Sequence, residues 1–423
     1  MTGRETGWMA GSEFYVGLDV GTTKVLCVVA QTETEGGLRL VGVGRSAGKG
    51  LQKGMVADIE LTAEAIKKAV KQAESLAAVR IHSAVIGVTG NHVSCRNEHA
   101  HVAITTPDYV IGEVDIERVM DQVKAVDLPG DREVLHVIAR EFTVDDQHGI
   151  KRPQGMSGKT LGVEAHLVTG AVTALNNIRA AVSRAGLGID DLVLEPIATA
   201  ESVLNEEEKE IGVAVVDVGG GTSDVAVFYE GAIIHSGVVP IGGNHFTRDL
   251  QIGLQTSFDE AERIKRQHGV AMQSLVKETS TFSLSTASGE QLREVPTQKA
   301  AYILEARSRE LLKLALKEIH KSRVLPMLSA GVVFTGGGSQ IRGMDSLARS
   351  LYEVIPIRMG LPSHVTSYAA DLLKDPGAST GIGLVLYSRR NWPARGLDTS
   401  TPKKFLAAFR ERLRSWFFPS NRP

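Results

Sequence analysis

Residues 213–228 constrain the fold of this chain more than any other stretch, because an apolar run turns sharply at three glycines and then resumes. Four apolar residues open the stretch, as is typical of a strand that is buried on both faces. Asp217 follows at the carboxyl end of this strand, and a second apolar strand begins at Val225. The pattern therefore predicts a β-hairpin. Its turn contains Gly219, Gly220, Gly221 and Thr222.

The chemistry of this turn suits a phosphate group with a metal ion. Successive backbone N–H groups in such a turn form an anion-binding nest, and glycine lets a ligand approach the backbone closely. The Asp217 carboxylate cannot hold a phosphate, but it can hold Mg²⁺ through water. An ordinary glycine-rich hairpin with a capping aspartate would contain the same residues, so this stretch alone leaves both interpretations open.

The same layout appears near the start of the chain, 198 positions before Asp217. An apolar strand ends at Asp19, a short turn follows, and a second strand begins at Val25. In both copies a third strand-like segment comes next, at residues 38–43 and 232–239. Two related halves, each with an Asp-Gly-Thr hairpin, suggest a duplicated fold with a nucleotide between them. The first turn contains Gly21, Thr22, Thr23 and Lys24.

A third glycine turn follows the apolar run 332–334 and precedes a helical pattern at 344–352. Its glycines are Gly336, Gly337 and Gly338. Here the backbone could approach a flat adenosine, or an α-phosphate at a helix N-terminus. The patterns G-x-G-x-x-G and G-x-x-x-x-G-K-[ST] are both unmet at these turns, which argues against dehydrogenases and P-loop enzymes.

Taken in order, these turns resemble the two phosphate motifs and the adenosine motif of the actin/Hsp70/sugar-kinase superfamily. Residues 194–200 resemble the start of its connecting helix, and residues 259–265 its ribose- and adenine-contacting helix. Within the superfamily, the bacterial FtsA family of cell-division proteins is most similar. The resemblance spans residues 14–389 and the C-terminal tail. The segments typical of FtsA lie at 135–138, 149–153, 156–158 and 238–244.

This resemblance implies an α/β fold of the duplicated actin-like (ribonuclease H-like) kind, with an inserted small α+β subdomain (SHS2, or 1C) and a C-terminal amphipathic helix. The expected parts are subdomain 1A at 13–90 and 168–210, the inserted subdomain at 91–167, subdomain 2A at 211–243 and 323–387, subdomain 2B at 244–322, a flexible linker at 388–402 and the amphipathic helix at 403–418.

The resemblance also implies a site for ATP between the two halves. Asp19 and Asp217 would hold Mg²⁺ through water, and both hairpins would cradle the phosphates. The third glycine turn would hold the adenosine together with Glu262 and Lys265, which lie three positions apart on one helix face. Glu195 would orient the attacking water in at most a slow ATPase. A carboxylate that simply favours a helix start would look the same.

The partners implied by FtsA are other division proteins, copies of the same chain in filaments, and the membrane. The protein would anchor filaments of the tubulin-like protein FtsZ to the inner face of the cytoplasmic membrane at the septum. Subdomain 2B would receive the C-terminal peptide of FtsZ, and Arg307 matches an arginine of that region. Charged helix faces are commonly just solvated, so a plain surface role for Arg307 stays open.

The tail carries the sequence pattern for membrane attachment. Residues 403–418 contain five basic residues and one acidic residue, a net charge of +4, whereas the whole chain has −2. At about 100° per residue, the apolar side chains fall within an arc of roughly 120°. They are Phe405, Leu406, Phe409, Leu413, Trp416 and Phe417. Such a helix lies in the interface of an anionic bilayer, although a helix that docks on its own core would share the pattern.

Composition excludes several other classes of protein. A net charge of −2 gives no bulk attraction to nucleic acid. Cys27 and Cys95 have no metal-ligand spacing, fit a reducing cytosol and are expected to be small buried residues. No window of about 20 apolar residues exists to span a membrane, and residues 1–12 lack the apolar core of a signal peptide.

Alternative functions on the same fold are a chaperone-type ATPase, a small-molecule kinase, or a pilus-assembly relative of FtsA that has no membrane tether. The adenosine motif is followed by no substrate domain of the Hsp70 kind, and no clear catalytic base for a kinase stands out. The basic amphipathic tail argues against the pilus relative.

Local patterns complete the expectations. Helices are expected at 62–77, 115–126, 171–185, 259–265, 301–320, 344–352 and 379–387. Residues 92–166 should form short strands, residues 145–158 a loop, residues 205–210 a solvated charged run, and residues 273–298 an exposed hairpin or loop.

Overall fold

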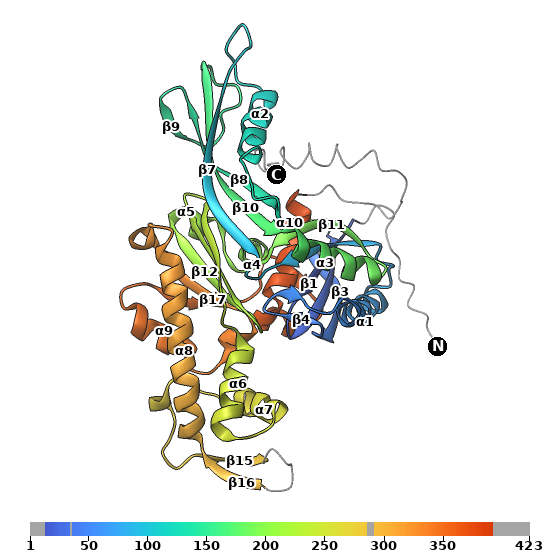
Figure 1. Cartoon of the computed structure of the whole chain (residues 1–423), viewed down its shortest axis with the longest axis vertical. Helices are drawn as coiled ribbons and strands as arrows, with labels where there is room; N and C mark the ends of the chain where they lie inside the picture. Colours follow the sequence, from blue (N-terminus) through green and yellow to red (C-terminus); the bar gives the residue numbers. More distant parts are fainter. Residues whose placement is uncertain (1–12, 34–35, 286–291, 392–423) are drawn as a thin grey trace.

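A computed structural model describes residues 13–33, 36–285 and 292–391 of the chain. Figure 1 shows an elongated molecule in which two β-sheets lie side by side in the middle, a third sheet rises above them, and a helical part extends below. The two central sheets belong to the two halves predicted from the repeated hairpins. The expected α/β architecture with a duplicated core and an insertion is therefore confirmed.

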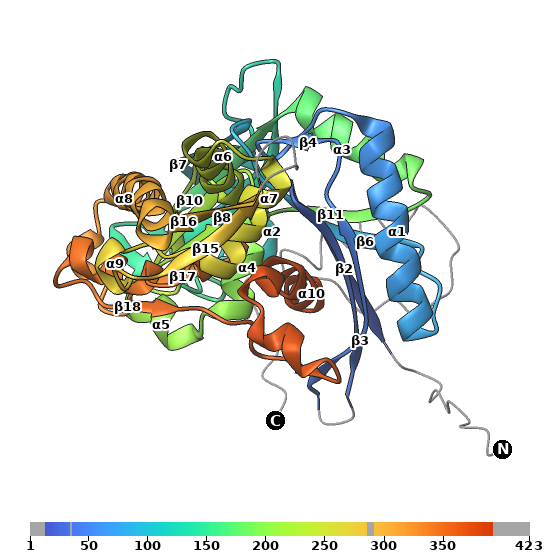
Figure 2. The ribbon, with the colours of Figure 1, turned by 90° about the horizontal axis from the view of Figure 1, so that it is seen from below.

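The first half is built on a six-stranded sheet in the order β11-β6-β1-β2-β3-β19. Its elements are β1 Phe14–Val20, β2 Lys24–Thr32, β3 Leu38–Ala47, α1 Ile59–Ala77, β6 Ser83–Val88, α3 Val172–Arg184, β11 Gly188–Leu194, β19 Thr366–Ser367 and α10 Ser379–Asn391, with a small ribbon of β4 Leu51–Gln52 and β5 Met55–Val56. Strands β1 to β3 form an antiparallel meander, and β6 and β11 extend it in parallel. Figure 2 shows α1 on one side of this sheet and α10 on the other. Apolar side chains of both helices pack on the sheet. Strand β19 and helix α10 therefore belong to the first half, whereas the expected bounds of subdomain 2A placed them in the second half.

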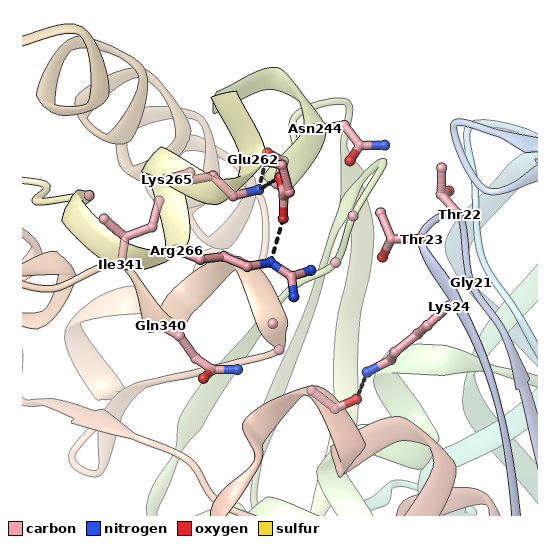
Figure 3. A pocket seen from close by; sticks show the side chains of 18 of the residues that line it. Gly21, Thr22, Thr23, Lys24, Asn244, Glu262, Lys265, Arg266, Gln340 and Ile341 are labelled. Carbon is pink, nitrogen blue, oxygen red and sulfur yellow. Dashed lines mark hydrogen bonds and ion pairs between the residues drawn. The ribbon is translucent and has the colours of Figure 1, made fainter. Parts of the chain in front are cut away.

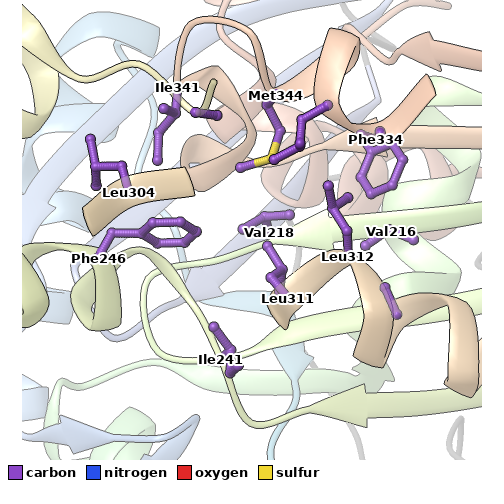
Figure 4. Close-up of a cluster of buried hydrophobic side chains, with 14 of the residues drawn as sticks. Val216, Val218, Ile241, Phe246, Leu304, Leu311, Leu312, Phe334, Ile341 and Met344 are labelled. Atoms are coloured by element: carbon purple, nitrogen blue, oxygen red, sulfur yellow. The ribbon is translucent and has the colours of Figure 1, made fainter. Parts of the chain in front are cut away.

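The second half repeats the meander in a five-stranded sheet in the order β14-β13-β12-β17-β18. Its elements are α4 Glu195–Val203, α5 Glu206–Ile211, β12 Val213–Val218, β13 Ser223–Tyr229, β14 Ala232–Val239, α8 Thr297–His320, β17 Gly331–Thr335, α9 Met344–Tyr352 and β18 Ile357–Met359. Every residue of β12 is buried, as the unbroken apolar run predicts. Figure 4 shows Val216 and Val218 of this strand packed with Leu311 and Leu312 of α8.

The two halves meet where α4 crosses α10. A Cβ atom at Gly383 of α10 would collide with the carbonyl oxygen of Ala198 in α4, so only glycine permits this close approach. Residues of both helices and of both sheets share one buried cluster, which includes Ile197, Val215 and Leu384. This crossing fixes the position of each half relative to the other.

The insertion between β6 and β11 forms its own sheet in the order β7-β10-β8-β9, covered by one helix. Its elements are β7 Val93–Ala103, α2 Glu113–Lys124, β8 Arg132–Val144, β9 Gln147–Ile150 and β10 Thr160–Ala171. Strands β7, β8 and β10 have 11, 13 and 12 residues, so the expectation of short strands is wrong. The expected loop at 145–158 contains β9, because Ile150 pairs with Phe142 of β8.

The helical part below the second sheet carries the Ser- and Thr-rich hairpin. Its elements are α6 Gly243–Leu254, α7 Phe258–His268, β15 Thr281–Ser285 and β16 Leu292–Pro296. The two strands pair antiparallel, which confirms the expected hairpin. Their buried side chains Phe282, Leu284 and Val295 join the core of the second half.

Capping explains one difference in helix boundaries. Helix α1 begins at Ile59 rather than at residue 62, because the Asp58 carboxylate accepts a hydrogen bond from the Leu61 N–H at 2.9 Å. Helix α8 likewise begins at Thr297 rather than at residue 301. Helices α3 and α7 lie close to their expected positions, and α9 has the expected bounds.

Two further expectations are wrong because tertiary contacts overrule the local pattern. The charged run 205–210 forms most of α5, and its Lys209 is buried, where the ammonium donates to Glu201 at 3.1 Å and Glu206 at 2.9 Å. Helix α10 continues to Asn391, with Ser388 and Asn391 buried, so the expected linker cannot begin at residue 388. The rest of that linker and the expected helix 403–418 lie outside the described residues.

The expected burial of the two cysteines is confirmed for Cys27 only. Cys27 is buried, whereas Cys95 is half-buried and its sulfur accepts a hydrogen bond from the Ser236 hydroxyl at 2.8 Å. Both thiols are free. Among the residues that the structure describes, no helix combines the length and the apolar character needed to cross a membrane.

Candidate functional site

A cavity with a volume of about 1390 Å³ lies between the two halves. This exceeds the roughly 300–1,000 Å³ of ordinary small-molecule sites, so a nucleotide fits within it. Every residue that the sequence assigns to a catalytic, metal or cofactor role lines this cavity, and Figure 3 shows part of the set. They are Asp19, Gly21, Thr22, Thr23, Lys24, Glu195, Asp217, Gly219, Gly220, Gly221, Thr222, Glu262, Lys265, Gly336, Gly337 and Gly338.

The two predicted hairpins face each other across this cavity. A Cβ atom at Gly221 would lie 2.6 Å from the Thr22 hydroxyl oxygen, and one at Gly220 would collide with the Thr23 side chain. The turn of the second hairpin therefore needs glycine at both of these positions. The turns from the two halves are close enough for one small anion to contact both.

The third glycine turn packs against the end of β12 in the second hairpin. Gly336 has a φ of +86°, and a Cβ atom there would collide with the Asp217 carboxylate. Gly338 lies against Val218, whereas a Cβ atom at Gly337 would have no atom within 4 Å. The turn thus leaves an open backbone surface on the cavity side, as a flat ligand would require.

Four buried carboxyl groups line the cavity: Asp19, Glu195, Asp217 and Asp224. Burial raises the pKa of Asp19 to about 6 and that of Asp224 to about 8. Burial also raises the pKa of Asp217 and of Glu195, and the nearby Asp19 carboxylate raises that of Glu195 further. A cation entering this cluster would favour the ionised carboxylates.

Hydrogen bonds hold two of these carboxyl groups in place. The Thr199 and Thr380 hydroxyls both donate to Asp217 Oδ2, at 2.9 and 2.8 Å. Asp224 accepts a hydrogen bond from the Thr89 hydroxyl. Glu195 Oε1 is buried and has no hydrogen-bond partner among the described residues. A buried acceptor of this kind, beside two aspartates, suits a water molecule on a divalent cation.

Lys24 connects the first hairpin to the segment that leads into α10. Its ammonium donates to the Gly377 carbonyl, as the dashed line in Figure 3 marks. The positive charge of Lys24 opposes the effect of burial on the pKa of Asp19. The lysine is therefore placed to meet a negatively charged ligand at the carboxyl cluster.

The opposite wall of the cavity comes from α7. Lys265 Nζ and Glu262 Oε2 form an ion pair at 2.6 Å, and Arg266 pairs with Glu262 Oε1 at 2.7 Å. Burial would raise the pKa of Glu262, but hydrogen bonds from Lys265 and Thr247 lower it overall. The predicted spacing of Glu262 and Lys265 thus places two polar groups side by side on the wall of the cavity that the third glycine turn also lines (Figure 3).

Several groups around the carboxyl cluster were not predicted from the sequence. Asp224 has a signal in the sequence, because it is a lone acidic residue at the start of an apolar strand, and its register partner is Asp217. Thr199 lies within the motif at 194–200, but its contact with Asp217, 18 residues away, has no signal there. Thr380 has no signal at all, since it reaches Asp217 from 163 residues away. Arg266 lies among other charged residues of α7, so the sequence alone does not single it out.

The predicted partner residue lies elsewhere. Arg307 is on α8, outside the cavity, and pairs with Asp249 at 2.6 Å and with Glu310 at 2.5 Å. Its expected role toward FtsZ stays a prediction. The six apolar residues of the expected membrane helix lie outside the described residues.

Solved structures with a similar fold include actin-like proteins. A type IV pilus biogenesis complex of PilM and PilN contains a chain that matches with a TM-score of 0.64 at 16% identity, covering 88% of this chain and 98% of that one. MreB5 of Spiroplasma citri, solved with ADP and with AMPPNP, matches with TM-scores of 0.52 and 0.51 at 14% and 15% identity, over 89% and 91% of this chain and 96% and 97% of the MreB5 chains. At these identities the likeness shows the fold alone.

Sequence comparison is more specific. The family described as "Cell division protein FtsA" matches residues 214–383, and the "SHS2 domain inserted in FTSA" matches residues 90–169. The cell division protein FtsA of Pseudomonas aeruginosa is 41% identical over 88% of both chains. FtsA of Escherichia coli K12 is 36% identical over 89% of this chain and 90% of the relative, and FtsA of Bacillus subtilis 35% over 92% and 86%. This chain belongs to the FtsA family of cell-division proteins.

Proposed function

We propose that this protein binds ATP with Mg²⁺ between its two halves. The observation that carries the proposal is the convergence of three glycine turns and four buried carboxyl groups on one cavity. Backbone N–H groups of the two hairpins would bind the phosphates. Glu262, Lys265 and the third glycine turn would hold the adenosine.

Asp19 and Asp217 would hold Mg²⁺ through water, because hard cations prefer carboxylate oxygens and usually keep several waters. The bound ion would supply charge neutralisation at the phosphates. Glu195 would accept a hydrogen bond from a water molecule near the phosphates, through the buried Oε1 atom. Burial raises the pKa of Glu195, and a bound cation would favour its ionised form, which can orient a water molecule. We expect at most slow hydrolysis.

The role in division would follow from two attachments, one to the membrane and one to FtsZ. Filaments of this chain would form under nucleotide control, and the helix at 403–418 would bind the inner face of the cytoplasmic membrane. The region around Arg307 would receive the C-terminal peptide of FtsZ, and the inserted subdomain would contact other copies and later division proteins. The protein would thereby tether FtsZ filaments to the membrane at the septum.

A vesicle co-sedimentation assay tests the tether. The full chain and a chain that ends at Asn391, where α10 ends, are compared on anionic vesicles in the presence of MgATP. A third chain carries Trp416→Glu, which places a charge on the apolar face. Binding that is lost in both altered chains supports the tether. Equal sedimentation of all three chains, or of none, rejects it and favours an ATPase of this fold without membrane attachment.

A further inference from the structure

The inserted subdomain reaches the wall of the nucleotide cavity through one buried side chain. His136 lies on β8, and its Nε2 atom accepts a hydrogen bond from the Leu194 backbone N–H at 3.0 Å. Leu194 ends β11 and is the N-cap residue of α4. The next residue is Glu195, which lines the cavity. A side chain of the insertion therefore fixes the backbone at the point where the cavity wall begins.

The chemistry of this bond defines the state of the imidazole ring. A backbone N–H only donates, so Nε2 must carry a lone pair and the ring must be neutral. Leu194 belongs to an edge strand of the first sheet. If His136 were absent, this buried N–H would lose its acceptor, and a buried donor without an acceptor is costly.

The same imidazole ring also contacts α10. Its centroid lies 6.3 Å from that of Tyr387, with the rings at 71°. The Tyr387 hydroxyl lies 3.4 Å from Asp191 Oδ2 on β11. His136 thus touches the two helices that cross between the halves, near the start of α4 and toward the end of α10.

Those two helices hold the carboxyl cluster. Helix α4 carries Glu195 and Thr199, and α10 carries Thr380. Both threonine hydroxyls donate to Asp217 Oδ2. A continuous set of contacts therefore runs from β8 of the insertion to the candidate metal site.

We propose that His136 is a positioning residue that couples the inserted subdomain to the nucleotide cavity, by holding the first turn of α4 and with it Glu195 and Thr199. This inference rests on the proposed binding of nucleotide. Coupling between sites is reciprocal. A partner that binds the insertion and shifts β8 would change nucleotide affinity, and nucleotide would in turn restrain β8.

Two substitutions at this position separate the hydrogen bond from packing. His136→Phe keeps an aromatic ring against Tyr387 but offers no acceptor. His136→Gln keeps an acceptor, because the amide oxygen can take the place of Nε2. His101→Phe is the matched control, since His101 is exposed on β7 of the same sheet.

The full-length chains are compared by titration with a fluorescent ATP analogue and Mg²⁺. We expect His136→Phe to weaken binding by about fivefold to tenfold, and His136→Gln and His101→Phe to bind like the wild type. A folded His136→Phe chain with unchanged affinity overturns the coupling and leaves nucleotide binding intact. A wild-type chain that fails to bind removes the proposed function itself.

Hydrogen exchange in the wild type provides a test that needs no substitution, should His136→Phe not fold. We expect MgATP to slow exchange of the Leu194 amide and of amides in β8 around His136. Protection confined to the two hairpins and the third glycine turn, with β8 unchanged, would overturn the inference.

Discussion

The two hairpins share one layout but differ in charge. In the first, Asp19 pairs in register with Leu26, whereas in the second Asp217 pairs with Asp224. The first turn carries Lys24, while the second has three glycines and no cation. The first half thus supplies a positively charged side chain, and the second supplies glycine backbone and an additional carboxyl group. Duplication preserved the geometry, and the two copies supply different chemistry.

The surroundings of the two aspartates differ as well. Asp217 receives two threonine hydrogen bonds and lies against Gly336, so its carboxylate has little freedom. The pKa of Asp19 depends mainly on burial, which raises it, and on the charge of Lys24, which lowers it. We therefore expect the second half to fix the metal site more firmly than the first.

Removing the charge of Asp19 or of Asp217 should weaken the affinity for MgATP, and the loss should be larger for Asp217. We expect Asp217→Asn to cost on the order of 100-fold and Asp19→Asn about tenfold, within the range seen when groups that orient metal-bound water are changed. Calorimetric titration of both variants and the wild type measures the two losses. Equal losses, or a larger loss for Asp19→Asn, would contradict the asymmetry.

Asp224 should make the stability of the second half depend on pH. Its pKa is raised to about 8 in the folded protein, from 3.8 in the unfolded chain. The folded state therefore keeps a proton that the unfolded state loses between about pH 4 and pH 8, and stability falls as the pH rises through this window. The substitution Asp224→Asn removes the part of this dependence that comes from Asp224, while Asp19, Asp217 and Glu195 keep their own raised pKa values.

Chemical denaturation at pH 5, 6, 7 and 8 measures the effect. The free energy of unfolding of Asp224→Asn should rise relative to that of the wild type by roughly 1–3 kcal/mol across the series. Glu164→Gln is the control, because Glu164 lies on the inserted sheet and is exposed. Parallel curves for the wild type and Asp224→Asn would refute the raised pKa.

The threonine contacts should have a smaller effect. We expect Thr380→Val to cost about 1 kcal/mol of stability and to weaken MgATP binding several-fold, because Asp217 loses one of its two hydroxyl donors. Thr106→Val, at an exposed position of the insertion, serves as the control. Thermal unfolding and nucleotide titration check both values. A Thr380→Val chain as stable and as tight-binding as the control would show that this contact does not hold Asp217.

The smallest effect on nucleotide affinity is expected from a substitution of Arg307, which does not line the cavity. Arg307→Ala should leave nucleotide affinity unchanged and cost at most about 1 kcal/mol of stability, since its ion pairs are partly exposed. The same titration measures it. A clear loss of nucleotide affinity would mean that α8 communicates with the cavity.

Much of the fold could be predicted because short local patterns in the sequence determine it. The hairpin glycines, the position of Asp217 after an apolar strand and the repeat at Asp19 all lie within short windows. The roles of Asp224 and Thr380 could not be predicted in the same way. Their contacts to the cluster depend on register across a strand pair and on a helix 163 residues away.

The errors have the same origin. Residues 205–210 are charged and look solvated, but Lys209 is buried because Glu201, on the preceding helix, pairs with it. Helix α10 extends past residue 387 because Asn391 is buried, and its side chain donates to the Tyr387 carbonyl at 3.0 Å. In both cases a contact outside the local window decides the structure.

The shared site for metal and phosphate is tested directly by titrating the wild-type chain with ATP, once with Mg²⁺ present and once with the ion removed by a chelator. If the carboxyl cluster holds a hydrated Mg²⁺ against the phosphates, Mg²⁺ should tighten ATP binding by about tenfold or more. Absence of binding, or equal affinity with and without Mg²⁺, would contradict a shared metal and phosphate site between the two hairpins.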